Sequence, residues 1–245
     1  MAEWISYESA DEPPAEVSID VDFDEDPDFK SAHPYAAIVT VSGFTVGSDG
    51  QPDDATSDAL YEVESGIEAA LNATGGALAV TVTEDGAFTL YGYVEDASHV
   101  DLLRSVSHQV LKIDVMSQRD DKWSDYERFI LRGEELEQAR DVEQIEQLEE
   151  TGAELDQPVE VFFYLEFESS DDLRDALPKL GQAGYTVPEI SDEYFGDEGL
   201  TVTREIVLST ESLSAERAKI NAIIGPMNGR YDGWAVDEDV VEEMV

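Results

Sequence analysis

The stretch from residue 77 to residue 94 reads ALAVTVTEDGAFTLYGYV and predicts a β-hairpin. Each half is rich in β-branched and aromatic residues, which are favoured in strands. The three residues between the halves, Glu84-Asp85-Gly86, are typical of a tight turn, because Asp and Gly tolerate the left-handed backbone that hairpin turns require. We therefore expect two antiparallel strands in the N-terminal half of the chain.

The segments on either side of this hairpin complete the order βαββαβ. Before it, a β-rich run is followed by a segment with apolar residues at helical spacing, for which Thr56 or Ser57 is the expected N-cap and Gly75-Gly76 the expected end. The expected elements around the hairpin are a strand at 35–44, a helix at 56–74, a helix at 98–109 and a strand at 111–116.

The second half of the chain repeats this order after one additional polar helix at 134–151. Its expected elements are strands at 159–167, 185–190, 200–208 and 230–236, helices at 171–183 and 212–227, and a turn at 196–199. The fold class that follows is α+β, with two ferredoxin-like domains whose antiparallel sheets carry helices packed on one face. We expect the first domain at 1–133, with two extra N-terminal strands in WISYES and VSIDVDF, and the second at 134–245.

The chain is strongly acidic along its whole length. It has 58 Asp and Glu against 14 Lys and Arg, and a formal net charge of −44. Such a surface repels itself in dilute salt and is screened at molar salt, where the Debye length is about 3 Å. The composition resembles that of a haloarchaeal cytoplasmic protein. The alternative is an acidic mimic of nucleic acid or a histone-binding protein, in which charge usually gathers in runs or on one face.

Several classes of function are disfavoured by what the sequence lacks. Without Cys there is no disulfide scaffold and no thiol nucleophile. The motifs G-x-x-x-x-G-K-[ST], G-x-G-x-x-G, H-E-x-x-H and G-x-S-x-G are all absent. The N-terminus has no apolar signal segment, and no apolar run approaches the roughly 20 residues that span a bilayer. We therefore predict a cytoplasmic protein that is not an enzyme and has neither a cofactor nor a membrane partner.

Neither the three histidines nor the densest acidic cluster is expected to bind a metal ion. His33 is remote from the predicted helix that carries His99 and His108, and nine residues of helix place those two on opposite sides. An acidic cluster resembles the start of a calcium loop, but Pro27 occupies the place of the turn-forming Gly. We expect this cluster to be a solvated strand end and turn; its members are Asp20, Asp22, Asp24, Glu25, Asp26 and Asp28.

Aromatic residues on two predicted strands could in principle stack on RNA bases, as in other ferredoxin-like sheets. Lys and Arg are scarce near them, and phosphate attraction supplies much of the affinity for RNA. We therefore expect these rings in the sheet–helix core or in a domain interface, and no direct binding of nucleic acid. They are Phe88, Tyr91, Tyr93, Phe162, Phe163, Tyr164 and Phe167.

The second half of the chain resembles the RraB family, regulators of ribonuclease activity that inhibit the endonuclease RNase E. The similar segments are DVEQIEQLEETGAELDQP followed by VFFYLEF, then LPKLGQAGYT, and finally Gly229-Arg230-Tyr231-Asp232-Gly233-Trp234. The first half, in WISY, LYEVESGIEAAL and FTLYGY, resembles a domain family of unknown function that is often fused to RraB-like domains. The resemblance implies a regulator that binds and inhibits an RNA-degrading endonuclease. The alternatives are an assembly module that forms a homo-oligomer, and a hydrolase using carboxylates with a divalent cation.

The last strand is the expected site of partner binding. Tyr231 and Trp234 are three residues apart, so a regular strand would point them to opposite faces. A bulge at Asp232-Gly233 would instead re-aim both rings. Because Trp and Tyr are preferred anchors of protein interfaces, the segment Tyr231, Asp232, Gly233 and Trp234 is the candidate partner-binding site, and a ribonuclease the expected partner.

Overall fold

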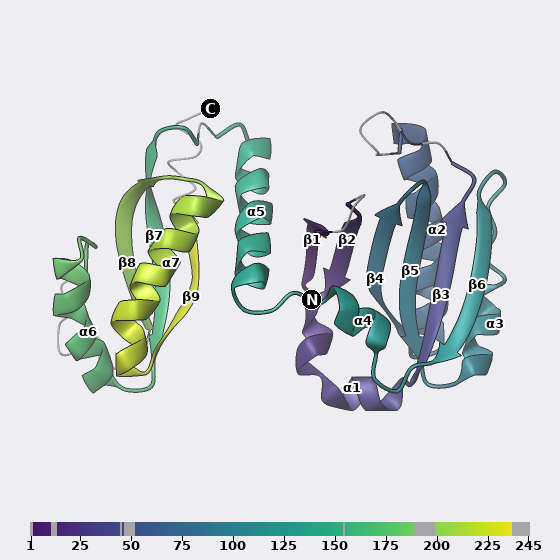
Figure 1. Ribbon diagram of the computed structural model, residues 1–245, viewed down its shortest axis with the longest axis horizontal. Helices are drawn as coiled ribbons and strands as arrows, with labels where there is room; N and C mark the ends of the chain where they lie inside the picture. Colours follow the sequence, from purple (N-terminus) through teal and green to yellow (C-terminus); the bar gives the residue numbers. More distant parts are fainter. Residues whose placement is uncertain are drawn as a thin grey trace. The chain divides into compact units, whose positions relative to one another are not determined.

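The structure is a computed structural model with two compact units, Met1–Ala139 (unit 1) and Arg140–Val245 (unit 2) (Figure 1). The residues that it describes are 2–10, 14–44, 46, 52–153, 155–188 and 199–236. Both units are α+β with antiparallel sheets, so the expected fold class is confirmed. The domain boundary expected between residues 133 and 134 stays a prediction. Helix α5 (Glu134–Glu150) begins at this point, and the boundary between the two compact units falls within the helix, between Ala139 and Arg140.

Unit 1 is built on a six-stranded sheet of order β1-β2-β4-β5-β3-β6. Its strands are β1 (Trp4–Glu8), β2 (Glu16–Asp20), β3 (Tyr35–Ser42), β4 (Ala77–Glu84), β5 (Ala87–Val94) and β6 (Lys112–Arg119). The predicted hairpin is β4–β5, and its turn residues Asp85 and Gly86 both have positive φ, 49° and 72°, as a type I′ turn requires. The order β4-β5-β3-β6 is that of a ferredoxin-like sheet, and the two expected N-terminal strands extend it beyond β4.

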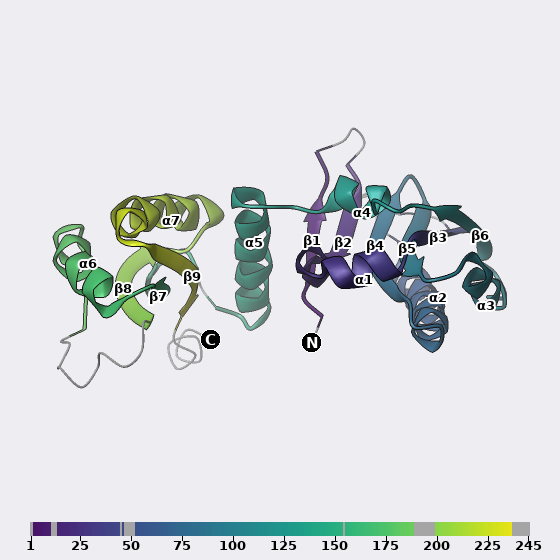
Figure 2. The same ribbon diagram turned by 90° about the horizontal axis from the view of Figure 1, so that it is seen from below.

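Helices cover both faces of this sheet. Their bounds are η1 (Val21–Glu25), α1 (Pro27–Ala32), α2 (Asp54–Ala73), η2 (Ala97–His99), α3 (Val100–Leu103) and α4 (Ser124–Phe129), where η marks a short 3₁₀ helix. Figure 2 shows α2 and α3 on one face and α4 on the other. Each face has its own apolar core, one around Leu71 and Leu90 and one around Trp123 and Tyr126. Unit 1 therefore differs from the expectation in one respect. Helices cover both faces of its sheet, whereas the ferredoxin-like fold predicts helices on one face.

Two helix boundaries expected for unit 1 are wrong. Helix α2 begins earlier than expected, because Asp53, and not Thr56 or Ser57, is its N-cap and accepts a hydrogen bond from the Thr56 amide at 2.8 Å. The helix expected at 98–109 ends at Leu103. The Ser105 hydroxyl donates to the Leu102 carbonyl at 2.6 Å, and such local side-chain bonds compete with helical ones.

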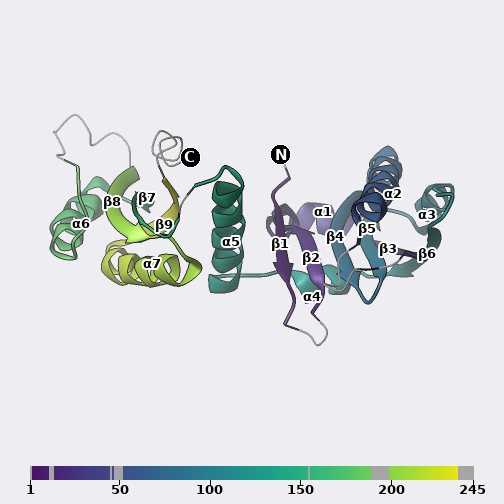
Figure 3. The same cartoon turned by 90° about the horizontal axis from the view of Figure 1, so that it is seen from above.

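In its described residues, unit 2 has a three-stranded sheet of order β8-β7-β9, formed by β7 (Pro158–Phe167), β8 (Gly199–Val207) and β9 (Gly229–Val236). Helices α6 (Ser170–Gln182) and α7 (Thr210–Ile224), followed by the short η3 (Gly225–Met227), supply the rest of its core. In Figure 3 helix α7 lies along one side of the strands. Alternate residues of β7 are buried in this core, and the intervening ones are exposed or half-buried on the opposite face.

Of the strand expected at 185–190, the described residues 185–188 form one bridge, between Thr186 and Thr203. Pro188 limits this pairing, because proline has no amide hydrogen to donate to a neighbouring strand. Residues 189 and 190 and the first three residues of the turn expected at 196–199 lie outside the described residues. In the described part of the chain, no helix is both long and apolar enough to cross a membrane.

Candidate functional site

The last strand, β9, contains a β-bulge at the predicted site. Trp234 lies opposite Phe163 and Tyr231 lies opposite Leu165, so β9 has one residue more than β7 between these two pairs. Gly233 takes up the extra residue with φ at +110°, a conformation that L side chains rarely adopt. The expectation that Tyr231 and Trp234 point to opposite faces is therefore wrong, and the bulge alternative is confirmed. Both rings point to the helix-covered side of the sheet.

Trp234 is a core residue of unit 2. It is 6% exposed and belongs to the same apolar cluster as Phe163. Its indole Nε1 donates a hydrogen bond to Asp141 Oδ1 at 2.9 Å, and its backbone carbonyl accepts one from Gln144 Nε2 at 3.2 Å. The indole is thus satisfied inside the unit, and its burial does not fit a role as an exposed anchor.

A buried ion pair lies beside this indole. Arg217 on α7 donates to Asp141 on α5 at 2.8 Å, and the two side chains are only 2% and 3% exposed. The Arg217 guanidinium also lies 5.9 Å from the ring centre of Tyr231. A charge buried to this degree is tolerated only where a counter-charge and hydrogen bonds replace its water. Together Asp141, Arg217 and Trp234 connect α5, α7 and β9.

The other half of the predicted segment faces the opposite side of the sheet. Asp232 contacts Arg230 at 3.0 Å, and Arg230 also reaches Glu166 on β7 at 2.5 Å. Tyr164, on the same side of β7, is 41% exposed. The bulge thus divides the four predicted site residues: Tyr231 and Trp234 support the sheet from the core, and Asp232 is presented on the side away from α7.

Only some of the aromatic residues expected in the core or in an interface are buried. Four are buried as expected, namely Phe88, Tyr93, Phe163 and Phe167. Phe162 and Tyr91 are half-buried, and Tyr164 is exposed. Strand β7 therefore presents two of its aromatic rings, Phe162 and Tyr164, on the face that the core does not use.

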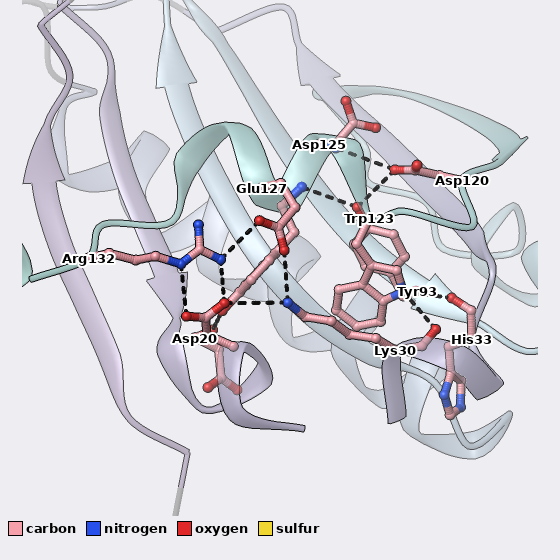
Figure 4. A network of polar contacts seen from close by, with 11 residues as sticks. Asp20, Lys30, His33, Tyr93, Asp120, Trp123, Asp125, Glu127 and Arg132 are labelled. Atoms are coloured by element: carbon pink, nitrogen blue, oxygen red, sulfur yellow. Dashed lines mark hydrogen bonds and ion pairs between the residues drawn. The ribbon is translucent and has the colours of Figure 1, made fainter. Parts of the chain in front are cut away.

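Unit 1 contains a second concentration of polar contacts, on its α4 face (Figure 4). Arg132 binds Asp24 and Glu127, the latter at 2.9 Å. Lys30 contacts the same two carboxylates, at 3.0 Å to Glu127 and 3.6 Å to Asp24. The Arg132 guanidinium holds the pKa of Asp24 below its ordinary value. Both cations are therefore paired with carboxylates. These ion pairs link Asp24 and Lys30, which precede β3, to Glu127 on α4 and to Arg132 after it.

Buried aromatic rings lie next to this cluster. The rings of Tyr93 and Trp123 stack with centroids 3.7 Å apart, and the Tyr93 hydroxyl donates to Asp120 at 3.3 Å. The Trp123 indole donates to the backbone carbonyls of Lys30 and His33, at 3.1 and 3.0 Å. These contacts hold the stretch around α4 against the sheet and give it a structural role.

The acidic cluster that ends β2 is not fully solvated, contrary to expectation. Asp20 is buried and accepts a hydrogen bond from the Asp22 amide at 3.1 Å, and burial raises the pKa of its carboxyl to about 6. Asp26 caps α1 by accepting from the Phe29 amide at 2.9 Å. Within the described residues, no group of three or more His, Asp or Glu side chains is arranged to hold a metal ion.

The three histidines lie in separate environments. His33 makes contacts of 2.8 Å to the carbonyls of Phe29 and Gly75, one through each ring nitrogen. His108 lies beyond the end of α3, so the expectation that it shares a helix with His99 is wrong. Its Nδ1 accepts from the Leu111 amide at 3.3 Å.

Sequence reasoning missed the pair Asp141 and Arg217, although a signal was present. Arg217 lies between Leu213 and Ile220 at helical spacing, and both neighbours are buried. Asp141 precedes Ile145 by one helical turn on α5. A charged residue inside an otherwise apolar stripe indicates a buried partner of opposite charge, because an unpaired charge at such a position is too costly.

Comparison with known families divides the chain in the same two parts. A family model described as Regulator of ribonuclease activity B matches residues 138–236. A second, described as Family of unknown function (DUF695), matches residues 2–131. No curated protein matches the chain.

Proposed function

Since the chain belongs to the family of unknown function DUF695 through residues 2–131 and matches the model Regulator of ribonuclease activity B over residues 138–236, we propose that it is a non-catalytic regulator that binds and inhibits an RNA-degrading endonuclease. The match of the second model to most of unit 2 is the observation that carries this proposal. Unit 1 would be an additional module of the same regulator.

The charge of the chain favours action on the enzyme over action on its substrate. A net charge of −44 repels RNA phosphates, and binding to RNA draws much of its affinity from Lys and Arg contacts. An acidic protein can instead compete for, or bind beside, the basic surface with which a ribonuclease holds RNA. Inhibition would then follow from occupancy, with no turnover by the regulator.

The test is a binding and inhibition assay in about 1 M KCl, where exposed charges are screened. The tagged chain is used to capture the endonuclease from cells, and the purified endonuclease is then assayed on a labelled single-stranded RNA with increasing amounts of the regulator. We expect cleavage to fall with the regulator concentration and to level off at saturation, and we expect the regulator alone neither to cut nor to shift the RNA. Cleavage that is unaffected at saturating regulator would refute the proposal.

A further inference from the structure

The side of the unit 2 sheet away from α7 carries an aromatic centre. Because alternate residues of β7 are buried in the core, Phe162 and Tyr164 belong to this opposite side. The pairing of the strands places Thr203 beside Phe162 and Thr201 beside Tyr164, and on the other flank Ala235 lies beside Phe162. Among the described residues of unit 2, this side has two aromatic side chains at its centre, flanked by Thr and Ala residues of the neighbouring strands. We call it the open sheet face.

Carboxylates surround this centre. Glu160 on β7 lies directly opposite Glu205 on β8, an arrangement of like charges that destabilises a sheet. Glu160 accepts a hydrogen bond from Thr203 at 2.9 Å, and within the described residues neither glutamate has a cation at ion-pair distance. Glu166 and Asp232 lie further along the face, and they share Arg230 between them. Thus the two carboxylates at one end of the face share a single cation, and the two adjacent carboxylates at the other end lack a counter-charge.

We propose that the open sheet face binds an arginine-bearing segment of a protein partner, which on the proposed function is the ribonuclease itself. A guanidinium is planar and weakly hydrated, so one arginine of the segment can stack on the ring of Phe162, the neighbour of Glu160 on this face, and a second arginine can stack on Tyr164. The N–H donors of the arginine on Phe162 can at the same time pair with Glu160 and Glu205, and this relieves their repulsion. The same surface disfavours RNA, because bases stacked on these rings would bring phosphates close to four carboxylates.

The direct test measures binding of a fluorescein-labelled peptide of Arg-Gly-Leu repeats by fluorescence anisotropy, in about 1 M KCl so that general attraction to the acidic surface is suppressed. We expect Glu160→Gln/Glu205→Gln to weaken binding at least about tenfold, a change of about 1.4 kcal/mol. Tyr164→Ser should weaken it by a similar factor, and a Lys-Gly-Leu peptide should bind more weakly than the arginine peptide, because stacking is lost. The melting temperature of each variant, measured by circular dichroism, verifies that the unit remains folded.

The matched control is Asp175→Asn/Glu211→Gln, which removes two exposed carboxylates from α6 and α7 and changes the net charge equally. We expect this control to bind the peptide within about twofold of the unaltered chain. Equal losses in the control and in the Glu160/Glu205 variant would overturn the proposal, since binding would then follow net charge alone. Tighter binding of a single-stranded RNA oligonucleotide than of the arginine peptide would also overturn it.

The same variants separate this inference from the proposed function. If the unaltered chain inhibits the endonuclease and Glu160→Gln/Glu205→Gln inhibits it equally well, the function stands and the open sheet face is not the site. If the peptide binds as expected and the endonuclease is not inhibited, the open sheet face is an arginine-binding site and the ribonuclease is not its partner.

Discussion

Replacing Asp141 by leucine should destabilise unit 2 more than any loss of an exposed ion pair. The carboxylate accepts hydrogen bonds from Arg217 at 2.8 Å and from the Trp234 indole at 2.9 Å, and both donors are buried. Removing one partner of a buried ion pair costs about 3–5 kcal/mol, because the remaining charge has lost its compensation. The indole N–H would also lose its acceptor, which costs about 1–3 kcal/mol where no substitute is found.

These two costs overlap, so we expect Asp141→Leu to lower the free energy of unfolding by at least about 3 kcal/mol. For a unit of this size, the melting temperature should fall by roughly 12 °C or more. Thermal melts followed by circular dichroism in about 1 M KCl measure the effect. The control is Asp171→Asn, which breaks an exposed pair with Arg174 in the first turn of α6 and should cost no more than about 1 kcal/mol.

The double variant Asp141→Leu/Arg217→Met tests the cause. It removes both charges and replaces them with apolar side chains, so it should be more stable than Asp141→Leu alone. If Asp141→Leu costs no more than the Asp171→Asn control, or if the double variant is less stable than the single one, the reasoning about the buried pair is refuted.

Three further predictions concern other parts of the chain. Trp234→Ala should cost about 3–5 kcal/mol of stability, as expected for a core ring, and a melt unchanged from that of the unaltered chain would contradict its burial. The pKa of Asp20 is raised from 3.8 to about 6, so the folded state prefers the protonated carboxyl. Stability should therefore fall as pH rises from about 4 to about 6. Asp20→Asn, which keeps an acceptor for the Asp22 amide, should reduce this fall in melts taken between about pH 4 and 7. The melting temperature should rise between dilute and molar KCl because 44 net negative charges are screened, and a salt series in which it stays constant would refute the interpretation of the composition as an adaptation to salt.

The sequence allowed most elements to be located, because each depends on neighbours along the chain. The β4–β5 hairpin follows from alternating apolar residues around Asp85-Gly86, and helix α2 from its apolar spacing. Helix α3 is shorter than its periodicity indicates, because that periodicity does not register the bond between the Ser105 hydroxyl and the Leu102 carbonyl.

The candidate site was predictable only in part. Asp232-Gly233 suggests a bulge, but the direction in which Tyr231 and Trp234 point depends on how β9 pairs with β7, a contact between distant segments. The same holds for Asp141 and Arg217, which are 76 residues apart in the sequence. The open sheet face requires three strands in register before its carboxylates become neighbours.

Hydrogen exchange at the two buried indole N–H groups reports how often each unit opens. The Trp123 N–H is hydrogen-bonded within unit 1 and the Trp234 N–H within unit 2. Their hydrogens can exchange with deuterium only when the surrounding core opens, so the two indole resonances would record the opening free energies of the two units separately in one NMR sample. Native-state hydrogen exchange can therefore show whether the intact chain unfolds in one step or in two, without any label or truncation.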